Sequence, residues 1–358
     1  MSSNLFDIRP VLRKLVSRSV LSEEEVYQTL NSILEGKLSD AAVAAFLVAL
    51  SMRGERSEEI RAILQIIRQY AVRISPKITG SLIDTCGTGG DAIKSFNIST
   101  AAAIVASSAG ATIAKHGNRS FSGFCGSADF LEYIGFDLQS PSEKVCSAIE
   151  NFGIGFLYAP SFHPSLRRVA SARNIIGIRT VFNIVGPLSN PCTNITGQLI
   201  GVFGTHLLEP IGRAVQNTGL NDIMVVHAVD GLDELSNTCE NEVLLINDNQ
   251  MKRITLHPKI LNLQVAKQEQ IIVNSKEQSL RDTLQVIFGV APQEKEDIVV
   301  LNASAALVVA RIAKDFHEGI DIARSAIKDG KPQQKLIELI RYCGNEERLE
   351  SAIRKFIP

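Results

Sequence analysis

The chain has 358 residues, 45% of them hydrophobic, which is enough for two domains with well-buried cores. Its 37 basic and 38 acidic residues give a net charge of −1 and form no block of like charge, which argues against nucleic acid or an anionic membrane as a partner. The six cysteines show no C-x-x-C spacing, the N-terminus lacks a signal-peptide core and no apolar run is long enough to span a bilayer, so we expect a reducing, cytoplasmic location.

The first seventy or so residues carry apolar side chains at helical spacing. Ser22 followed by Glu25 has the pattern of a capping box, and Ser39 and Ser57 precede further apolar stretches. This part of the chain therefore predicts a small bundle of about four helices.

From Leu82 onward, short apolar runs alternate with helical segments, which predicts a mostly parallel sheet flanked by helices. The expected strands are 111–114, 136–138, 154–158, 199–203 and 223–228, with an antiparallel hairpin formed by 242–246 and 251–256. Residues 280–288, 297–313 and the C-terminal tail are expected to be helical. Two proline-bearing stretches, 159–164 and 186–191, bracket a helical segment and are candidate hinges.

A glycine-rich turn, 84–91, follows the predicted strand that ends at Ile83. Its glycines carry no Cβ atom, so an anion could approach the backbone N–H groups. Ser99 or Thr100 leads into an alanine-rich helix, 101–109, whose N-terminus would face the same anion. The turn thus predicts a phosphate-binding floor.

Two common nucleotide-binding loops are excluded. Position 92 is Ala, where the G-x-G-x-x-G fingerprint needs Gly, and no G-x-x-x-x-G-K-S/T string is present. The turn therefore supports neither NAD nor an ATP P-loop.

A second loop begins with Lys115, directly after a predicted buried strand. A lysine there is costly unless its ammonium reaches a polar cleft, so we expect it to meet a phosphate. His116 could act at the site or simply bond to backbone. Asn118 could orient a substrate or hold the turn, and Arg119 could bind a substrate or pair with Asp129.

An acidic pair, Asp233 and Glu234, follows the predicted strand 223–228. Mg²⁺ takes one or two protein carboxylates and fills its other positions with water and phosphate oxygens, so the pair suits a magnesium site. An acidic helix start that complements the helix dipole is the alternative.

Four arginines, Arg167, Arg168, Arg173 and Arg179, lie in the segment between the two proline-bearing stretches. One of them could hold a substrate carboxylate in a bidentate fork. By residue type alone they are interpreted as a solvated basic face, with Arg173 no different from its neighbours.

Seven segments resemble the signature segments of the anthranilate phosphoribosyltransferase family, in family order and over essentially the whole chain. They are 87–91, 96–100, 115–119, 126–129, 163–164, 177–183 with 186–188, and 230–236. Two places depart from the family pattern: Phe124, where many relatives carry Lys, and 237–240, which lacks the usual Thr-Gly-Pro-Thr character.

The resemblance implies a Mg²⁺-dependent reaction of tryptophan biosynthesis, in which the amine of anthranilate displaces pyrophosphate from phosphoribosyl pyrophosphate. It assigns no nucleophile or base. Implied binders of phosphoribosyl pyrophosphate are Gly87, Gly89, Gly90, Asp91, Asn97, Ser99, Thr100, Lys115 and Ser127. Implied binders of anthranilate are Gly87, His116, Asn118, His163 and Arg173, and implied metal ligands are Ser99, Asp233 and Glu234.

The resemblance also implies a fold and an assembly. The fold is a small helical domain, 1–72 plus 164–190, packed on a larger α/β domain with a mostly parallel central sheet, 73–163 plus 191–358, similar to the nucleoside phosphorylases. A homodimer through the helical domain is expected, and a complex with a glutamine amidotransferase is left open. The rival interpretations are a pyrimidine nucleoside phosphorylase-like enzyme, which needs no Mg²⁺ pair, and a family-like nucleic-acid-binding protein, which the balanced charge opposes.

Overall fold

The N-terminal part of the molecule is a helical bundle. The computed structural model describes residues 6–89, 93–120, 123–216, 218–247 and 250–358. The bundle consists of α1 (Arg9–Val16), α2 (Glu23–Leu34), α3 (Asp40–Arg53) and α4 (Ser57–Gln69). The predicted capping box is present at the start of α2, where the Glu25 N–H donates to the Ser22 Oγ and the Ser22 N–H donates to the Glu25 carboxylate. The four predicted helices are confirmed.

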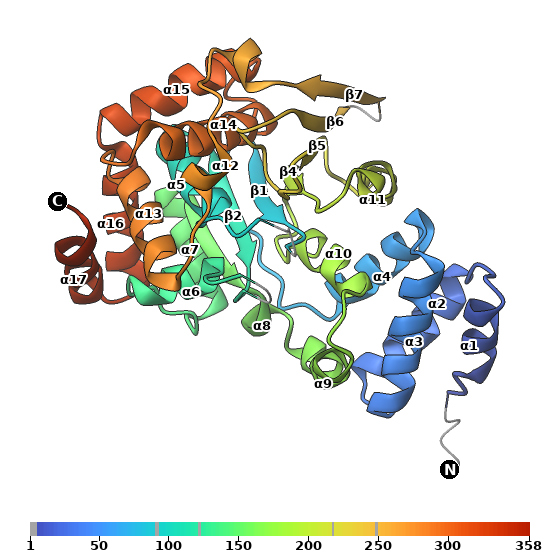
Figure 1. Cartoon of the computed structure of the whole chain (residues 1–358). Coiled ribbons are helices and arrows are strands. Elements are labelled where there is room, and N and C mark those ends of the chain that lie inside the picture. Colours follow the sequence, from blue (N-terminus) through green and yellow to red (C-terminus); the bar gives the residue numbers. More distant parts are fainter. Residues whose placement is uncertain (1–5, 90–92, 121–122, 217, 248–249) are drawn as a thin grey trace.

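A seven-stranded mixed sheet forms the centre of the larger part (Figure 1), in the order β3-β2-β1-β4-β5-β6-β7. The first five strands in this order are parallel, and β5, β6 and β7 pair antiparallel. Their bounds are β1 (Leu82–Gly87), β2 (Thr112–Gly117), β3 (Ile154–Tyr158), β4 (Gly197–Gly201), β5 (Asp222–Ala228), β6 (Asn241–Asn247) and β7 (Gln250–Leu256). The predicted parallel sheet and its antiparallel hairpin are confirmed.

Helices cover both faces of the sheet. α5 and α14 pack on one face, in the main hydrophobic core, and α11 packs on the other, in the core that continues into the helical bundle. The helices of this part are α5 (Ile98–Ser108), α6 (Ser127–Tyr133), α7 (Ser142–Phe152), α8 (Ala159–Phe162), α11 (Leu208–Val215), α12 (Gln268–Ile271), α13 (Lys276–Ile287), α14 (Gln293–Val309), α15 (Phe316–Lys328), α16 (Lys331–Cys343) and α17 (Glu346–Phe356). Short 3-10 turns span Pro164–Leu166, Thr205–Leu207 and Pro258–Leu261.

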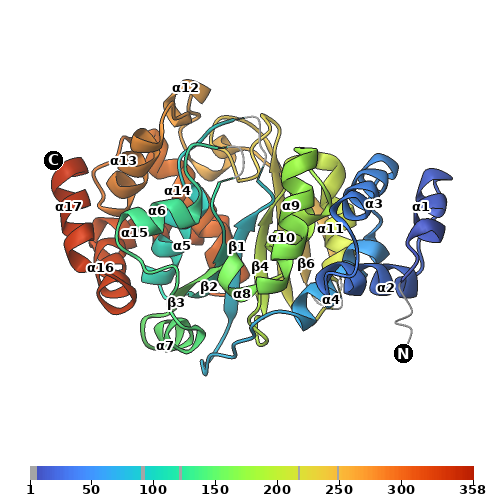
Figure 2. The ribbon, with the colours of Figure 1, turned by 90° about the horizontal axis from the view of Figure 1, so that it is seen from below.

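Two helices from the middle of the chain join the bundle. α9 (Arg167–Ile176) packs on α2 and α3, and α10 (Val181–Leu188) packs on α3 and α4. Figure 2 shows both helices between the sheet and α3. The chain therefore leaves the α/β part after β3, contributes to the bundle and returns before β4.

Four expectations about the strands were wrong. The strand expected at 199–203 lies at Gly197–Gly201. Residues 136–138 form no strand, and Phe136 makes only an isolated bridge to Gly344. β1 does not end at Ile83 but pairs with β4 as far as Gly87, so half of the predicted turn is strand. β2 likewise pairs with β3 through Gly117, which places Lys115 inside a strand instead of after one. In both cases the partner strand supplies backbone hydrogen bonds that local sequence does not reveal.

In the part of the chain that the structure describes, no helix combines the length and apolarity that a membrane crossing requires.

Candidate active site

The carboxyl ends of β1, β2, β4 and β5 meet at one edge of the sheet, the edge at which open α/β sheets bind ligands. Gly87 ends β1, and a Cβ atom there would lie 2.4 Å from the Oδ2 atom of Asp233. Gly89 has a φ of +65°, and its N–H donates to the same Oδ2 atom over 2.6 Å. The glycines thus let the acidic loop reach the turn. Gly90 and Asp91, two predicted phosphate binders, lie outside the described residues.

Lys115 lies at the centre of this edge. It is buried, and its Nζ donates to the Thr85 carbonyl over 2.7 Å and to the Ser99 Oγ over 3.2 Å. Burial lowers the pKa of Lys115, while the nearby Asp84 and Glu234 carboxylates act in the opposite direction. A buried ammonium group with polar neighbours, near the carboxyl end of a parallel strand, is suited to bind an anionic ligand.

The acidic pair does not begin a helix. Residues 229–240, between β5 and β6, form a loop without helical residues, so the alternative of an acidic helix start is wrong. Glu234 accepts the Ser99 N–H at Oε1 over 3.2 Å, at the N-terminus of α5. The pKa of Asp233 is raised, mainly because its carboxyl group is buried.

The chemistry of this donor set fits Mg²⁺. Asp233 and Glu234 supply two carboxylates, and Ser99, bonded to both Lys115 and Glu234, supplies a hydroxyl. Among the described residues no three His, Cys, Asp or Glu side chains gather as a metal cage. Two carboxylates that leave room for water and phosphate oxygens are typical of Mg²⁺ and atypical of a closed structural site.

The N-terminus of α5 is tied to the rest of the α/β part. Asn97 precedes α5; its N–H donates to the Thr283 Oγ1, and its side-chain amide donates to the Ser279 Oγ. Thr100 is buried, and its Oγ1 has no hydrogen-bond partner among the described residues. Both predicted residues therefore lie at the helix start beside Ser99, with Asn97 engaged by α13.

His116 and His163 form a buried pair on the other side of Lys115. Their ring centroids lie 5.1 Å apart in an edge-to-face arrangement. Burial lowers the pKa of His116 well below its ordinary value and that of His163 to about 4. The His116 Nε2 atom and both ring nitrogens of His163 have no hydrogen-bond partner among the described residues. Two neutral imidazoles with spare polar atoms are suited to orienting a polar aromatic ligand.

The described residues of the loop after β2 are held mainly by contacts with α6. Asn118 is exposed, and its Oδ1 accepts the Arg119 N–H, as its turn-holding interpretation predicts. Ser127 donates from Oγ to the Asn118 carbonyl. Arg119 forms ion pairs with Asp129 over 3.0 Å and Glu132 over 2.8 Å, so its structural interpretation is confirmed.

Arg173 differs from the other three arginines of its segment, contrary to the interpretation by residue type. Arg167, Arg168 and Arg179 are exposed, whereas Arg173 is half-buried, burial lowers its pKa, and its guanidinium lies 5.8 Å from the centroid of the Phe182 ring.

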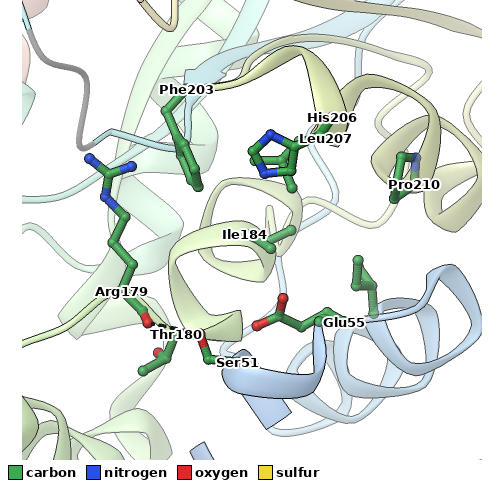
Figure 3. Close-up of a pocket in the computed structure, with 11 residues that line it drawn as sticks. Ser51, Glu55, Arg179, Thr180, Ile184, Phe203, His206, Leu207 and Pro210 are labelled. Atoms are coloured by element: carbon green, nitrogen blue, oxygen red, sulfur yellow. Dashed lines mark hydrogen bonds between the residues drawn. The ribbon is translucent and has the colours of Figure 1, made fainter. Parts of the chain in front are cut away.

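A cavity of about 300 Å³ lies between the α3–α4 corner, the start of α10 and the loop after β4. Figure 3 shows the residues that line it. The Arg179 guanidinium covers the Phe203 ring at 4.2 Å on one side of this cavity, and Glu55 projects from the opposite side. Among the residues that line it, Arg179 is one of the four candidate arginines, and none is a substrate or metal binder that the resemblance implies.

Sequence reasoning missed the polar layer beneath the site. Asp84 in β1 is fully buried, and its carboxylate accepts the His116 N–H and a Gln198 amide N–H. Gln198 also donates to the carbonyl of Pro187, in α10. Asp84 was expected in the turn, where an acid can be solvated; its burial follows from the extension of β1 along β4, and a buried acid has to be satisfied.

Comparisons with known proteins show what the chain is similar to. Residues 9–71 match the family model described as "Glycosyl transferase family, helical bundle domain", and residues 79–333 match "Glycosyl transferase family, a/b domain". The chain is 40% identical to an anthranilate phosphoribosyltransferase of Acetivibrio thermocellus, over 94% of this chain and 97% of that one.

Solved structures give the same result. The crystal structure of anthranilate phosphoribosyltransferase from Thermus thermophilus superposes with a TM-score of 0.86 at 36% identity, over 93% of this chain and 98% of that one. The Saccharomyces cerevisiae enzyme in complex with PRPP and Mg superposes with a TM-score of 0.86 at 25% identity, over 94% and 97%.

Proposed function

The chain belongs to the anthranilate phosphoribosyltransferase family, and we propose that the edge formed by β1, β2 and the 229–240 loop is where it acts. The protein transfers the phosphoribosyl group from phosphoribosyl pyrophosphate to the amine of anthranilate and releases pyrophosphate, a Mg²⁺-dependent step of tryptophan biosynthesis. One observation supports this location of the active site. Lys115, Ser99 and the carboxylates of Asp233 and Glu234 lie together at the carboxyl ends of the parallel strands.

The phosphate half of the site would be built around Lys115. Its ammonium would bind phosphate oxygens, together with Gly87, Gly89, Asn97, Ser99, Thr100 and Ser127, and with Gly90 and Asp91 as further proposed binders. Asp233, Glu234 and Ser99 would hold Mg²⁺, which when bound offsets negative charge on the pyrophosphate leaving group.

The anthranilate-binding half of the site would be formed by His163, His116, Asn118 and Arg173. Gly87 would lie between this half and the phosphate-binding half. The guanidinium of Arg173 would pair with the carboxylate of anthranilate, and the neutral imidazoles would orient its ring and amine.

The chemistry needs no nucleophile from the protein. Departure of pyrophosphate develops positive charge on the ribose, and the lone pair of the aromatic amine attacks without a strong base. Lys115 stabilises the leaving group, and the remaining side chains align the two substrates and exclude water.

We further propose a domain division at 1–72 plus 164–190 and 73–163 plus 191–358. The packing of α9 and α10 against the bundle supports it. We also propose a homodimer through the helical part, in which the exposed apolar side chains Val16 on α1, Met52 on α3 and Ile175 on α9 would be covered. A cytoplasmic location is supported by six cysteines that are all free thiols.

Genetic complementation tests the function. Expression of the chain should restore growth without tryptophan to a bacterium that lacks its own anthranilate phosphoribosyltransferase, and a Lys115→Met variant should not. Failure of the folded wild-type chain to restore growth, together with phosphate-dependent cleavage of a pyrimidine nucleoside in vitro, would favour the phosphorylase interpretation instead.

A further inference from the structure

The backbone beside the acidic pair is held by a buried side chain from a distant helix. Asn302, on α14, is 1% exposed. Its Oδ1 accepts the Leu235 N–H over 3.0 Å, and its Nδ2 donates to the Leu235 carbonyl over 2.7 Å. The other Nδ2 proton bonds to the Ile298 carbonyl over 2.8 Å, so the whole amide is engaged.

The next residue, Ser236, is also held through both its N–H and its carbonyl. Asn241, the first residue of β6, accepts the Ser236 N–H over 2.7 Å and donates to the Ser236 carbonyl over 2.8 Å. Two buried asparagines therefore clamp consecutive residues of a loop that has no regular secondary structure of its own.

Close packing against β4 fixes the backbone of the loop at Asp233. An ideal Cβ atom at Gly201 would lie 1.5 Å from the Asp233 carbonyl oxygen, so β4 and the loop backbone are in direct contact. Asp233 and Glu234 lie between this contact and the clamp at Leu235. Any shift of Leu235 would carry Glu234 away from the Ser99 N–H and Asp233 away from the Gly89 N–H.

We propose that Asn302 is a positioning residue for the Asp233–Glu234 pair, which fixes the two carboxylates in the arrangement that binds Mg²⁺ with phosphoribosyl pyrophosphate. This inference rests on the metal role proposed above for the two acids. α14 packs on β4, β5 and α5. The two hydrogen bonds between Asn302 and Leu235 therefore fix the loop relative to the core of the α/β part. Side chains that orient metal ligands from behind typically change metal affinity or activity by about 10- to 100-fold when removed.

Two variants test the proposal. Asn302→Ser shortens the side chain and breaks the two-way bond, whereas Asn302→Asp keeps the shape and the acceptor but removes both N–H donors. Ser304→Ala is the matched control, because Ser304 is fully buried on the same helix and its hydroxyl, as far as the described residues go, bonds only to the Leu301 carbonyl of its own turn. Circular dichroism and a thermal unfolding curve establish that each protein is folded.

Binding and kinetic constants distinguish a positioning role from a general loss of structure. Isothermal titration calorimetry of phosphoribosyl pyrophosphate, with and without Mg²⁺, should show roughly a 10- to 100-fold weaker Kd in Mg²⁺ for both Asn302 variants. The Kd without Mg²⁺ and the KM for anthranilate should stay at their wild-type values, as should every constant of Ser304→Ala.

Equal weakening with and without Mg²⁺, or an unchanged Kd in folded Asn302 variants, would overturn the positioning role while leaving the proposed function intact. If Mg²⁺ did not affect binding to the wild-type protein, the metal assignment itself would be wrong, and the inference with it.

Discussion

The Lys115 ammonium and the Ser99 hydroxyl lie 3.2 Å apart, although one belongs to a strand and the other to the first turn of a helix. This contact joins the cation of the phosphate half of the site to the hydroxyl beside the acidic loop, because the Ser99 N–H also donates to Glu234. The ammonium proposed to bind phosphate and the carboxylates proposed to hold Mg²⁺ are thus brought together through the parallel order β2-β1-β4-β5.

Lys115→Met should selectively weaken binding of phosphoribosyl pyrophosphate. Loss of one charge-assisted contact to a phosphate corresponds to about 1.5–3 kcal/mol, so we expect the KM for this substrate to rise roughly 10- to 100-fold or more. The KM for anthranilate should change little. Initial rates with each substrate varied in turn check this, and an equal rise of both KM values would contradict it.

Asp233→Asn combined with Glu234→Gln should abolish Mg²⁺-dependent turnover in a folded protein, because amides cannot supply the charge that Mg²⁺ requires. A titration of activity against Mg²⁺ concentration provides the measurement, and the conservative Asp230→Asn change in the same loop is the control. Asp230 bonds within the loop to Ser236 and Thr238 and is not a proposed ligand. Full activity of the double variant would remove both acids from the site.

Arg173→Ala should raise the KM for anthranilate roughly 10- to 100-fold and leave that for phosphoribosyl pyrophosphate nearly unchanged, since the guanidinium is proposed to pair with the aromatic carboxylate. Arg167→Ala, an exposed arginine at the start of the same helix, is the matched control. If both variants behave alike, Arg173 belongs to the solvated face after all.

The histidine pair predicts a dependence of stability on pH. Burial holds the pKa of His163 near 4 in the folded protein and lowers that of His116 as well, against about 6.5 in the unfolded chain. Between these values the unfolded chain binds more protons, so the free energy of unfolding falls as pH drops from about 6.5 toward 4.

Urea unfolding at pH 7 and pH 5 measures this effect. His163→Asn should show a smaller loss of stability at pH 5 than the wild-type protein does. An equal loss in both proteins would show that His163 is not the group responsible.

Gly201→Ala should displace the acidic loop, because the new Cβ atom would overlap the Asp233 carbonyl oxygen. Overpacking of this kind typically costs about 1–3 kcal/mol, so we expect a lower unfolding midpoint together with weaker binding of phosphoribosyl pyrophosphate. Gly204→Ala, three residues further along the chain after β4, is the control, since the nearest described atoms to its Cβ belong to the exposed ring of His206, which can turn away. Normal binding by Gly201→Ala would contradict the close packing of the loop.

Much of this arrangement could be predicted from the sequence. Helix caps such as Ser22 and alternating apolar runs specify the bundle and the parallel sheet, since these signals are local. The strand bounds could not be predicted, because β1 and β2 are extended by pairing with β4 and β3. Lys115 was expected to bind phosphate after a strand; it lies within one, and its proposed role remains a prediction.

Other parts of the site depend on tertiary contacts that leave no local pattern. Arg173 differs from Arg167 only by burial against neighbouring helices, and the clamp at Leu235 comes from Asn302, 67 positions away. The buried position of Asp84 also depends on a tertiary contact, because the sequence placed it in the turn and pairing with β4 makes it part of β1.

The central claim is tested most directly by following anthranilate fluorescence after mixing the purified protein with phosphoribosyl pyrophosphate and Mg²⁺, and omitting each component in turn. We predict that fluorescence is lost only when protein, both substrates and Mg²⁺ are all present, and that pyrophosphate appears in equal amount. Unchanged fluorescence in the complete mixture, with a demonstrably folded protein, would contradict the account.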